Sequence, residues 1–192
     1  MRAPATERPL IAGPTEGPED PFPLRLSGPV IKGFGRGSKE LQIPTANIPI
    51  DGLRVGGCET VESGVYYGYA GLDIPATTDD DDKSSAATAT ATATTATDSK
   101  VFPMVMSIGW NPFYKNSVRS VEVHIIHTFP KDFYGVQMNL VILGFIRPEF
   151  DYVSKEALIE DIKMDIRVGE KSLQREGYRK YRNDPYLTNF EC

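Results

Sequence analysis

A glycine-rich segment, residues 28–47, is the strongest candidate for chemistry in this sequence; it runs GPVIKGFGRGSKELQIPTAN. Glycines stand at alternate positions from Gly33 to Gly37, and glycine lets backbone N–H groups come close to a phosphate. Arg36 and Lys39 supply positive charge beside them. The segment matches neither the GxxxxGK[ST] nor the GxGxxG pattern. The spacing therefore indicates a phosphate-binding loop without a standard motif, and a mobile connection between strands is the alternative.

The same segment ends in Pro44-Thr45-Ala46-Asn47, which places a hydroxyl and a carboxamide two residues apart. In an extended backbone such residues point to the same side. Oxygen ligands of this kind suit Mg²⁺ when phosphate oxygens and water complete the shell. Thr45 and Asn47 are therefore candidate metal and phosphate ligands. The alternative is a turn in which both side chains bond to nearby backbone.

A candidate general base lies in an alternating segment, residues 121–129. Its apolar residues alternate with Glu122 and His124, so the expected strand has one apolar and one polar face. A carboxylate within reach of a hydroxyl can accept its proton during phosphoryl transfer. The alternative is a solvated carboxylate without a chemical role, as for most strand glutamates. His124 and His127 are three residues apart and thus on opposite faces, so a shared metal is not expected.

The elements that must position these residues are mainly strands. Val65–Leu72 and Val101–Trp110 are β-branched and aromatic runs, and Asn139–Ile146 is a further apolar run. Gly, Pro and Asn residues separate these segments, which is typical of a small closed or nearly closed antiparallel barrel. The sequence therefore predicts a mainly β fold.

One segment near the C-terminal end has a helical period. Ser154 can cap its start, Gly169 lowers the local helix propensity, and Gly177 is a candidate stop. Apolar residues at spacings of three, four and seven form a stripe that should lie on the barrel: Ile159, Ile162, Ile166 and Leu173.

Two segments are expected to lie outside the barrel. Residues 1–23 hold six of the fifteen prolines and predict a flexible tail. Residues 76–99 combine the acidic run Asp79–Asp82 with Ala86–Thr97, which contains only alanine and threonine. They predict a low-complexity loop insert between two neighbouring strands. Residues 24–192 are then expected to form a single domain.

Composition excludes several classes of protein. The 192 residues are 40% hydrophobic and 24% charged, as in an ordinary globular domain. Residues 1–23 carry a net charge of −2 and residues 76–99 carry −4, so the rest of the chain is left at about +1 of the total of −5, and the expected barrel has no basic nucleic-acid footprint. Two cysteines, Cys58 and Cys192, are too few for a disulfide framework. No signal, transit or membrane-spanning segment is evident, which favours a cytoplasmic protein.

Several motifs in a fixed order give the sequence a family resemblance. GFGRGSK is followed by IPTAN, SIGWNPFYKN, EVHIIHTF, FYG and GFIRPE. This series, spread over residues 27–175, closely resembles the eukaryotic, fungal-like riboflavin kinases, or flavokinases. The resemblance implies a six-stranded antiparallel Greek-key β-barrel with a C-terminal α-helix packed on it. It also implies conversion of riboflavin and MgATP to FMN and ADP.

Carried over position by position, the resemblance implies roles for single residues. Gly33 and Lys39 fall around the nucleotide phosphates, and Thr45 and Asn47 fall at the Mg²⁺ and phosphate positions. Glu122 takes the place of the catalytic carboxylate. The nucleotide-side positions correspond to His127 and Tyr134, and Arg147 in the RPE turn falls beside the flavin.

The leading hypothesis is therefore an ATP:riboflavin 5′-phosphotransferase that uses Mg²⁺, with Zn²⁺ or Mn²⁺ as substitutes. A monomer with riboflavin and ATP as its substrates, and with neither nucleic-acid nor membrane partners, is expected. Gln42 in place of a usual glycine, together with the insert, keeps a second hypothesis open: a flavin- or nucleotide-binding barrel without turnover.

Overall fold

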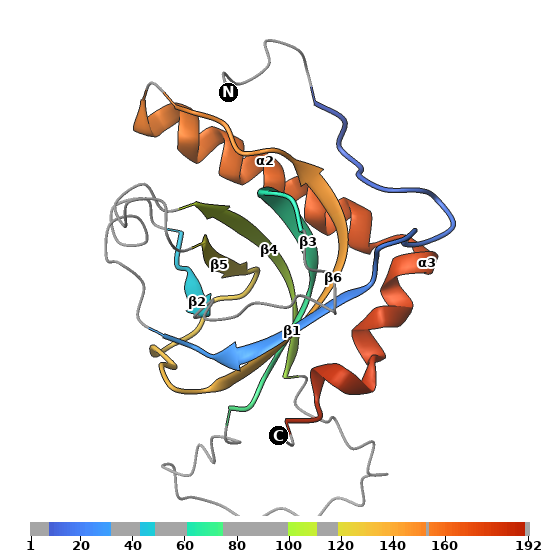
Figure 1. Cartoon of the computed structure of the whole chain (residues 1–192), viewed down its shortest axis with the longest axis vertical. Helices are drawn as coiled ribbons and strands as arrows, with labels where there is room; N and C mark the ends of the chain where they lie inside the picture. The colour runs from blue at the N-terminus through green and yellow to red at the C-terminus, as the bar shows by residue number, and fades with distance from the viewer. Residues whose placement is uncertain are drawn as a thin grey trace, which may run out of the picture.

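A curled sheet with a long helix against one side makes up the described part of the chain, shown as a computed structural model in Figure 1. The structure describes residues 8–31, 43–48, 61–74, 100–110, 119–152 and 154–190. Its strands are β1 (Leu24–Pro29), β2 (Ala46–Ile48), β3 (Gly64–Leu72), β4 (Val101–Trp110), β5 (Arg119–Ile125) and β6 (Gln137–Arg147). Its helices are α2 (Lys155–Leu173) and α3 (Glu176–Arg179), followed by the 3-10 turns η2 (Lys180–Asn183) and η3 (Pro185–Leu187).

Antiparallel pairing joins the six strands of the described ranges into one sheet in the order β1-β6-β3-β4-β5-β2. β3, β4 and β5 form a meander and β6 returns to lie beside β3, which is a Greek-key connection. The two edges of the sheet approach each other just after β1, where the Ile31 N–H donates to the Asn47 carbonyl oxygen at 2.8 Å. The predicted mainly β, nearly closed barrel with a C-terminal helix is confirmed.

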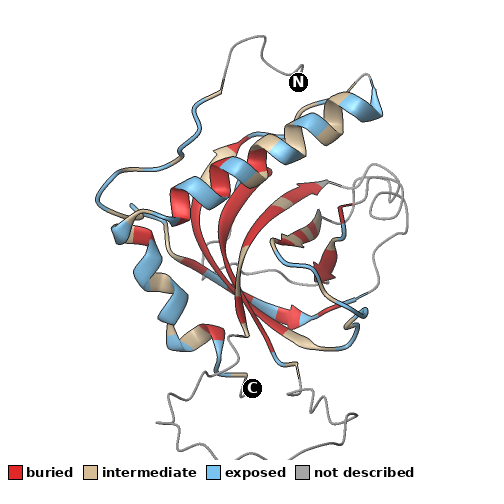
Figure 2. Cartoon of the chain, turned by 180° about the vertical axis from the view of Figure 1, so that it is seen from behind, coloured by how far each residue is buried: buried red, intermediate tan, exposed pale blue. Residues whose placement is uncertain are grey.

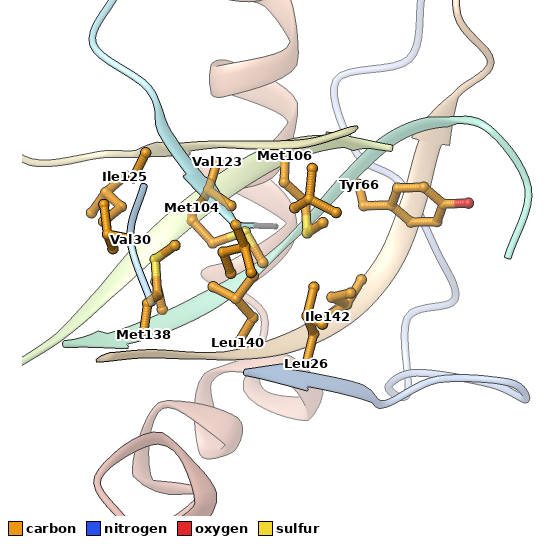
Figure 3. Packing of buried hydrophobic residues seen from close by; sticks show 14 of the residues in the cluster. Leu26, Val30, Tyr66, Met104, Met106, Val123, Ile125, Met138, Leu140 and Ile142 are labelled. Atoms are coloured by element: carbon orange, nitrogen blue, oxygen red, sulfur yellow. The ribbon is translucent and has the colours of Figure 1, made fainter. Parts of the chain in front are cut away.

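Apolar side chains fill the inside of the barrel (Figure 3). The alternation predicted for β5 is confirmed, because Val121 and Val123 are fully buried inside while Glu122 and His124 face outward with partial exposure. Side chains from other strands meet these valines in the same interior, among them Leu26, Met104, Met106, Met138, Leu140 and Ile142. The barrel interior is thus a packed core, and chemistry must take place on its outer face or rim.

Helix α2 covers the outer face of β3, β4 and β6, as the burial colours of Figure 2 show. Ser154 caps it as predicted, accepting a hydrogen bond from the Ala157 N–H at 3.2 Å. The prediction that Gly177 ends this helix is wrong. The helix ends at Leu173, where Gln174 in helical backbone geometry donates to the Glu170 carbonyl oxygen, so no left-handed glycine is needed.

Residues 8–17, which we call the N-terminal strap, lie along α2 and α3 (Figure 1). The Arg175 guanidinium donates to the carbonyl oxygens of Ala12, Gly13 and Pro14. The Tyr67 hydroxyl also donates to the Ala12 carbonyl oxygen, at 2.8 Å. The sequence predicts a flexible tail for residues 1–23. Residues 12–14 instead accept hydrogen bonds from Tyr67 and Arg175, which lie far away in the sequence.

The expected insert, residues 76–99, lies outside the described residues, but the strands that it connects are neighbours. Gly71 pairs with Val101, and the Leu72 N–H donates to the Lys100 carbonyl oxygen at 3.0 Å. The predicted pairing of the two flanking strands is confirmed. Among the described residues, no helix has both the length and the apolar character needed to cross a membrane.

Candidate active site

Three polar residues form a row across the outer face of β2, β5 and β4. Asn47 is the register partner of Glu122, and Glu122 is in turn the register partner of Ser107. Residues directly opposite each other in antiparallel strands share a face and place their Cβ atoms about 4.5–5.5 Å apart. Strand pairing thus brings together Glu122 and Asn47, two residues that the sequence placed in separate motifs.

Glu122 is a carboxyl group in a partly desolvated place. Burial raises its pKa above the ordinary value, because the charged form loses contact with water. A raised pKa makes the ionised carboxylate a stronger proton acceptor than an exposed glutamate. Glu122 therefore has the electrostatic character that a general base needs.

Asn47 is a buried polar residue, 5% exposed. Its backbone carbonyl accepts from Ile31, yet within the described residues no hydrogen bond reaches its carboxamide. A buried amide without a partner costs free energy, which a bound ligand can recover. The Asn47 side chain is therefore suited to hold a ligand.

Thr45 precedes Asn47 by two residues and is partly exposed. Its segment is held against β5, because the Pro44 carbonyl oxygen lies 2.8 Å from His124 Nδ1. Thr45 and Asn47 together supply the neutral oxygens that a divalent cation accepts alongside phosphate and water. Among the described residues, no three His, Cys, Asp or Glu side chains gather to hold a metal ion.

Val30 and Ile31, at the start of the glycine-rich segment, are hydrogen-bonded to two different parts of the chain. The Val30 carbonyl oxygen accepts from the Gly135 N–H at 2.8 Å, and the next residue, Ile31, donates to Asn47. Tyr134, which precedes Gly135, is 51% exposed. Tyr134 and Asn47, the last residue of the glycine-rich segment, therefore both lie near its start at Val30 and Ile31. Gly33 and Lys39 themselves lie outside the described residues, so their predicted phosphate contacts stay a prediction.

His127 is exposed and follows β5 by two residues. Its ring centroid lies 4.6 Å from that of Phe102 and 4.8 Å from that of Phe129. The Phe129 ring in turn lies 4.6 Å from that of Phe133. His127 thus belongs to a group of contacting aromatic rings whose last member, Phe133, directly precedes Tyr134 in the sequence.

Arg147 ends β6 and is 7% exposed. Its Nε and Nη2 donate to the Asp165 carboxylate of α2 at 2.6–3.1 Å, and its Nη1 donates to the Pro148 carbonyl oxygen at 3.0 Å. Burial alone would lower the pKa of Arg147, but the hydrogen bonds and charge of Asp165 raise it, so the guanidinium stays charged. The structure thus places Arg147 in a buried ion pair, and its contact with a flavin stays a prediction.

Two residues on the same outer face, Ser107 and Glu149, were not among those predicted. The Glu149 carboxylate lies against Gly109 of β4, where any Cβ would collide with it. Gly109 and Ser107 are two apart on one strand and so share a face. The alternation of β4 could have placed Ser107 on the polar face, but no local pattern in the sequence predicts the position of Glu149.

Comparison with known proteins points to one family. A family model described as flavokinase, riboflavin kinase, matches residues 20–173. A riboflavin kinase of Neosartorya fischeri is 56% identical over 191 residues, which cover 89% of this chain and 86% of the relative. A riboflavin kinase of Aspergillus terreus is 49% identical over 197 residues, which cover 93% of this chain and 87% of the relative.

Solved structures support the same fold. A crystal structure of riboflavin kinase from Trypanosoma brucei matches with a TM-score of 0.60 at 24% identity, over 88% of this chain and 92% of that chain. At this identity the match speaks for a shared fold alone.

Proposed function

The chain belongs to the riboflavin kinase family, and on this premise we propose that it transfers the γ-phosphoryl group of ATP to the 5′-hydroxyl of riboflavin. The products are FMN and ADP. One observation carries this proposal for the site: Asn47 and Glu122 are register partners on one face. Their pairing sets a proton acceptor beside a side chain suited to hold phosphate and a cation.

Glu122 is the general base in this proposal. The riboflavin hydroxyl oxygen forms a bond to the γ-phosphorus while its proton passes to the Glu122 carboxylate. The bond between the γ-phosphorus and the bridging oxygen breaks, and ADP leaves with that electron pair. The raised pKa of Glu122 supports this role, because it strengthens the carboxylate as an acceptor.

Thr45 and Asn47 bind the phosphates and the divalent cation. Riboflavin kinases depend on ATP and a divalent metal, and we propose Mg²⁺ here, with Zn²⁺ or Mn²⁺ as substitutes. Such a cation neutralises charge on the transferred phosphoryl group. The buried Asn47 carboxamide, without a partner among the described residues, supports this placement. Gly33 and Lys39 are proposed to enclose the phosphates.

The nucleotide and the flavin occupy different ends of the polar row in this proposal. His127 and Tyr134 lie on the nucleotide side in this proposal, and Gly135, the residue after Tyr134, is hydrogen-bonded to Val30 at the start of the glycine-rich segment. Arg147 lies on the flavin side, and the chain that follows it carries Glu149 onto β4.

We further propose a monomer that works in the cytoplasm with riboflavin and ATP as its only partners, without nucleic acid. In this proposal residues 24–192 form one domain, with residues 76–99 as an insert. The mass of the particle in solution, measured by light scattering, tests the monomer directly.

The experiment that tests the function is incubation with riboflavin and MgATP, followed by chromatographic separation of the flavins. FMN and ADP should appear in equal amounts, and FMN should be absent when ATP is left out. Tight binding of both ligands without any FMN would favour the second hypothesis, a binding barrel without turnover.

A further inference from the structure

Two arginines that are far apart in the sequence share one buried carboxylate. The Arg8 Nη1 donates to Asp165 Oδ1 at 3.0 Å, and Arg147 donates to both oxygens of the same carboxylate. Asp165 is 2% exposed. Burial raises the pKa of Asp165, and the charges of the two guanidinium groups oppose that rise. The ionised form of Asp165 therefore depends on both arginines.

Arg8 also binds the carboxylate one turn earlier on α2. Its Nη2 donates to Asp161 Oδ1 at 2.6 Å, and the other oxygen, Oδ2, accepts from the Tyr152 hydroxyl at 2.6 Å. Burial and this hydrogen bond raise the pKa of Tyr152, so its hydroxyl keeps the proton that it donates. We call these five residues the strap cluster: Arg8, Arg147, Tyr152, Asp161 and Asp165.

The strap cluster holds both ends of the segment that follows β6. Arg147, the last residue of β6, donates to the carbonyl oxygen of the first residue, Pro148, and Tyr152 binds Asp161 at the other end. Between them, Glu149 lies against Gly109, on the face of β4 that also carries Ser107. Ser107 is the register partner of Glu122, so the segment lies beside the polar row.

We propose that Arg8 is a positioning residue for the flavin side of the active site, acting through Asp161 and Asp165 on residues 147–152. This inference rests on the proposed function. Without Arg8, two carboxylates of α2 face a single guanidinium, and the charge balance that holds both ends of the segment is lost. Within the described residues, no hydrogen bond or ion pair joins Arg8 to β2 or β5, so the use of ATP should be spared.

The test compares Arg8→Met with the wild type in the full chain, by steady-state kinetics with each substrate varied in turn. The KM for riboflavin should rise roughly 3- to 10-fold while the KM for ATP stays unchanged, the size expected for coupling within one hydrogen-bonded network. Arg8→Lys should restore part of the loss, because an ammonium replaces the charge but not the forked geometry. Arg25→Met is the matched control, since it breaks an exposed ion pair with Asp184 that lies outside the strap cluster.

Titration of riboflavin fluorescence with each variant adds a readout that needs no turnover. Weaker riboflavin binding by Arg8→Met, but not by Arg25→Met, is expected. If Arg8→Met does not fold, Asp161→Asn removes one of the two ion pairs of Arg8 and should give the same split between the two KM values, with a smaller rise for riboflavin. An unchanged KM for riboflavin, or an equal rise in both KM values, would overturn the inference. Arg8 would then serve only to hold the N-terminal strap on α2. A wild type that forms no FMN would instead overturn the proposed function, and the two failures are thus distinguishable.

Discussion

Glu122 is held where its charged form is disfavoured. Its strand neighbours Val121 and Val123 are buried apolar residues that stabilise the barrel, whereas burial raises the pKa of Glu122. A neutral side chain of the same shape would serve the fold at least as well. Stability therefore does not explain a carboxylate on this face, which agrees with the proton transfer that we propose for it.

The raised pKa leads to a prediction about stability. The folded state binds the Glu122 proton more tightly than the unfolded state, so this residue's contribution falls as pH rises from its ordinary pKa of 4.5 through the raised value. Glu122→Gln should thus melt at the same temperature as the wild type, or higher, at pH 7. The difference should shrink as the pH falls below the ordinary pKa. Thermal melts across this pH range check the sign, and a variant less stable than wild type at neutral pH would contradict the desolvation of Glu122.

Thr45 offers a second test at this scale. Thr45→Val removes the hydroxyl with little change of volume, so the KM for ATP should rise roughly 10-fold, the effect of one lost bond to a charged group. Riboflavin binding should change little. Thr188→Val, at an exposed threonine in the C-terminal segment, is the control. Equal weakening of both ligands in calorimetric titrations would show that the Pro44–Asn47 segment had collapsed instead.

At the scale of elements, local patterns explain what could be predicted from the sequence. The alternation of β5 is visible in a few consecutive residues, and so is the Ser154 cap of α2. The pairing of β2 with β5 is not local, and only this pairing sets Asn47 opposite Glu122. The sequence does not predict the contacts of the strap for a similar reason: the strap has no apolar period, and partners such as Arg175 lie far away in the sequence.

The connection between β3 and β4 gives a prediction for an element. Replacing Thr77–Ser99 by a short Asn-Gly turn should leave the melting temperature and both KM values nearly unchanged. Leu72 and Lys100 are already hydrogen-bonded, and loop-closure entropy changes by only about 0.6 kcal/mol per doubling of loop length. Melting curves and kinetics at low and high salt check this.

The rival idea for the same insert is that the acidic run Asp79–Asp82 docks on Arg36 and Lys39 and hinders ATP binding. Deletion would then lower the KM for ATP at low salt only. Such a salt-dependent change, or a large fall in melting temperature, would show that the insert is not inert.

At the scale of the whole molecule, the barrel separates packing from chemistry. Its interior is filled with apolar side chains, and α2 packs on β3, β4 and β6. Asn47 and Glu122 lie on β2 and β5, away from the three strands on which this helix mainly packs. The N-terminal strap crosses α2 from outside and joins it to the end of β6 through Asp165. The strap, α2 and the end of β6 are thus joined by one set of buried ion pairs, and the segment after β6 carries Glu149 against β4.

The most direct measurement is FMN formation by the wild type and by Glu122→Gln at saturating riboflavin and MgATP, with ligand binding measured in parallel. The wild type should form FMN. The variant should bind both ligands with nearly unchanged affinity but show a kcat lower by roughly 10² to 10⁴, the usual contribution of a general base. A variant that turns over within a few-fold of the wild type would contradict the assignment of Glu122 as the base.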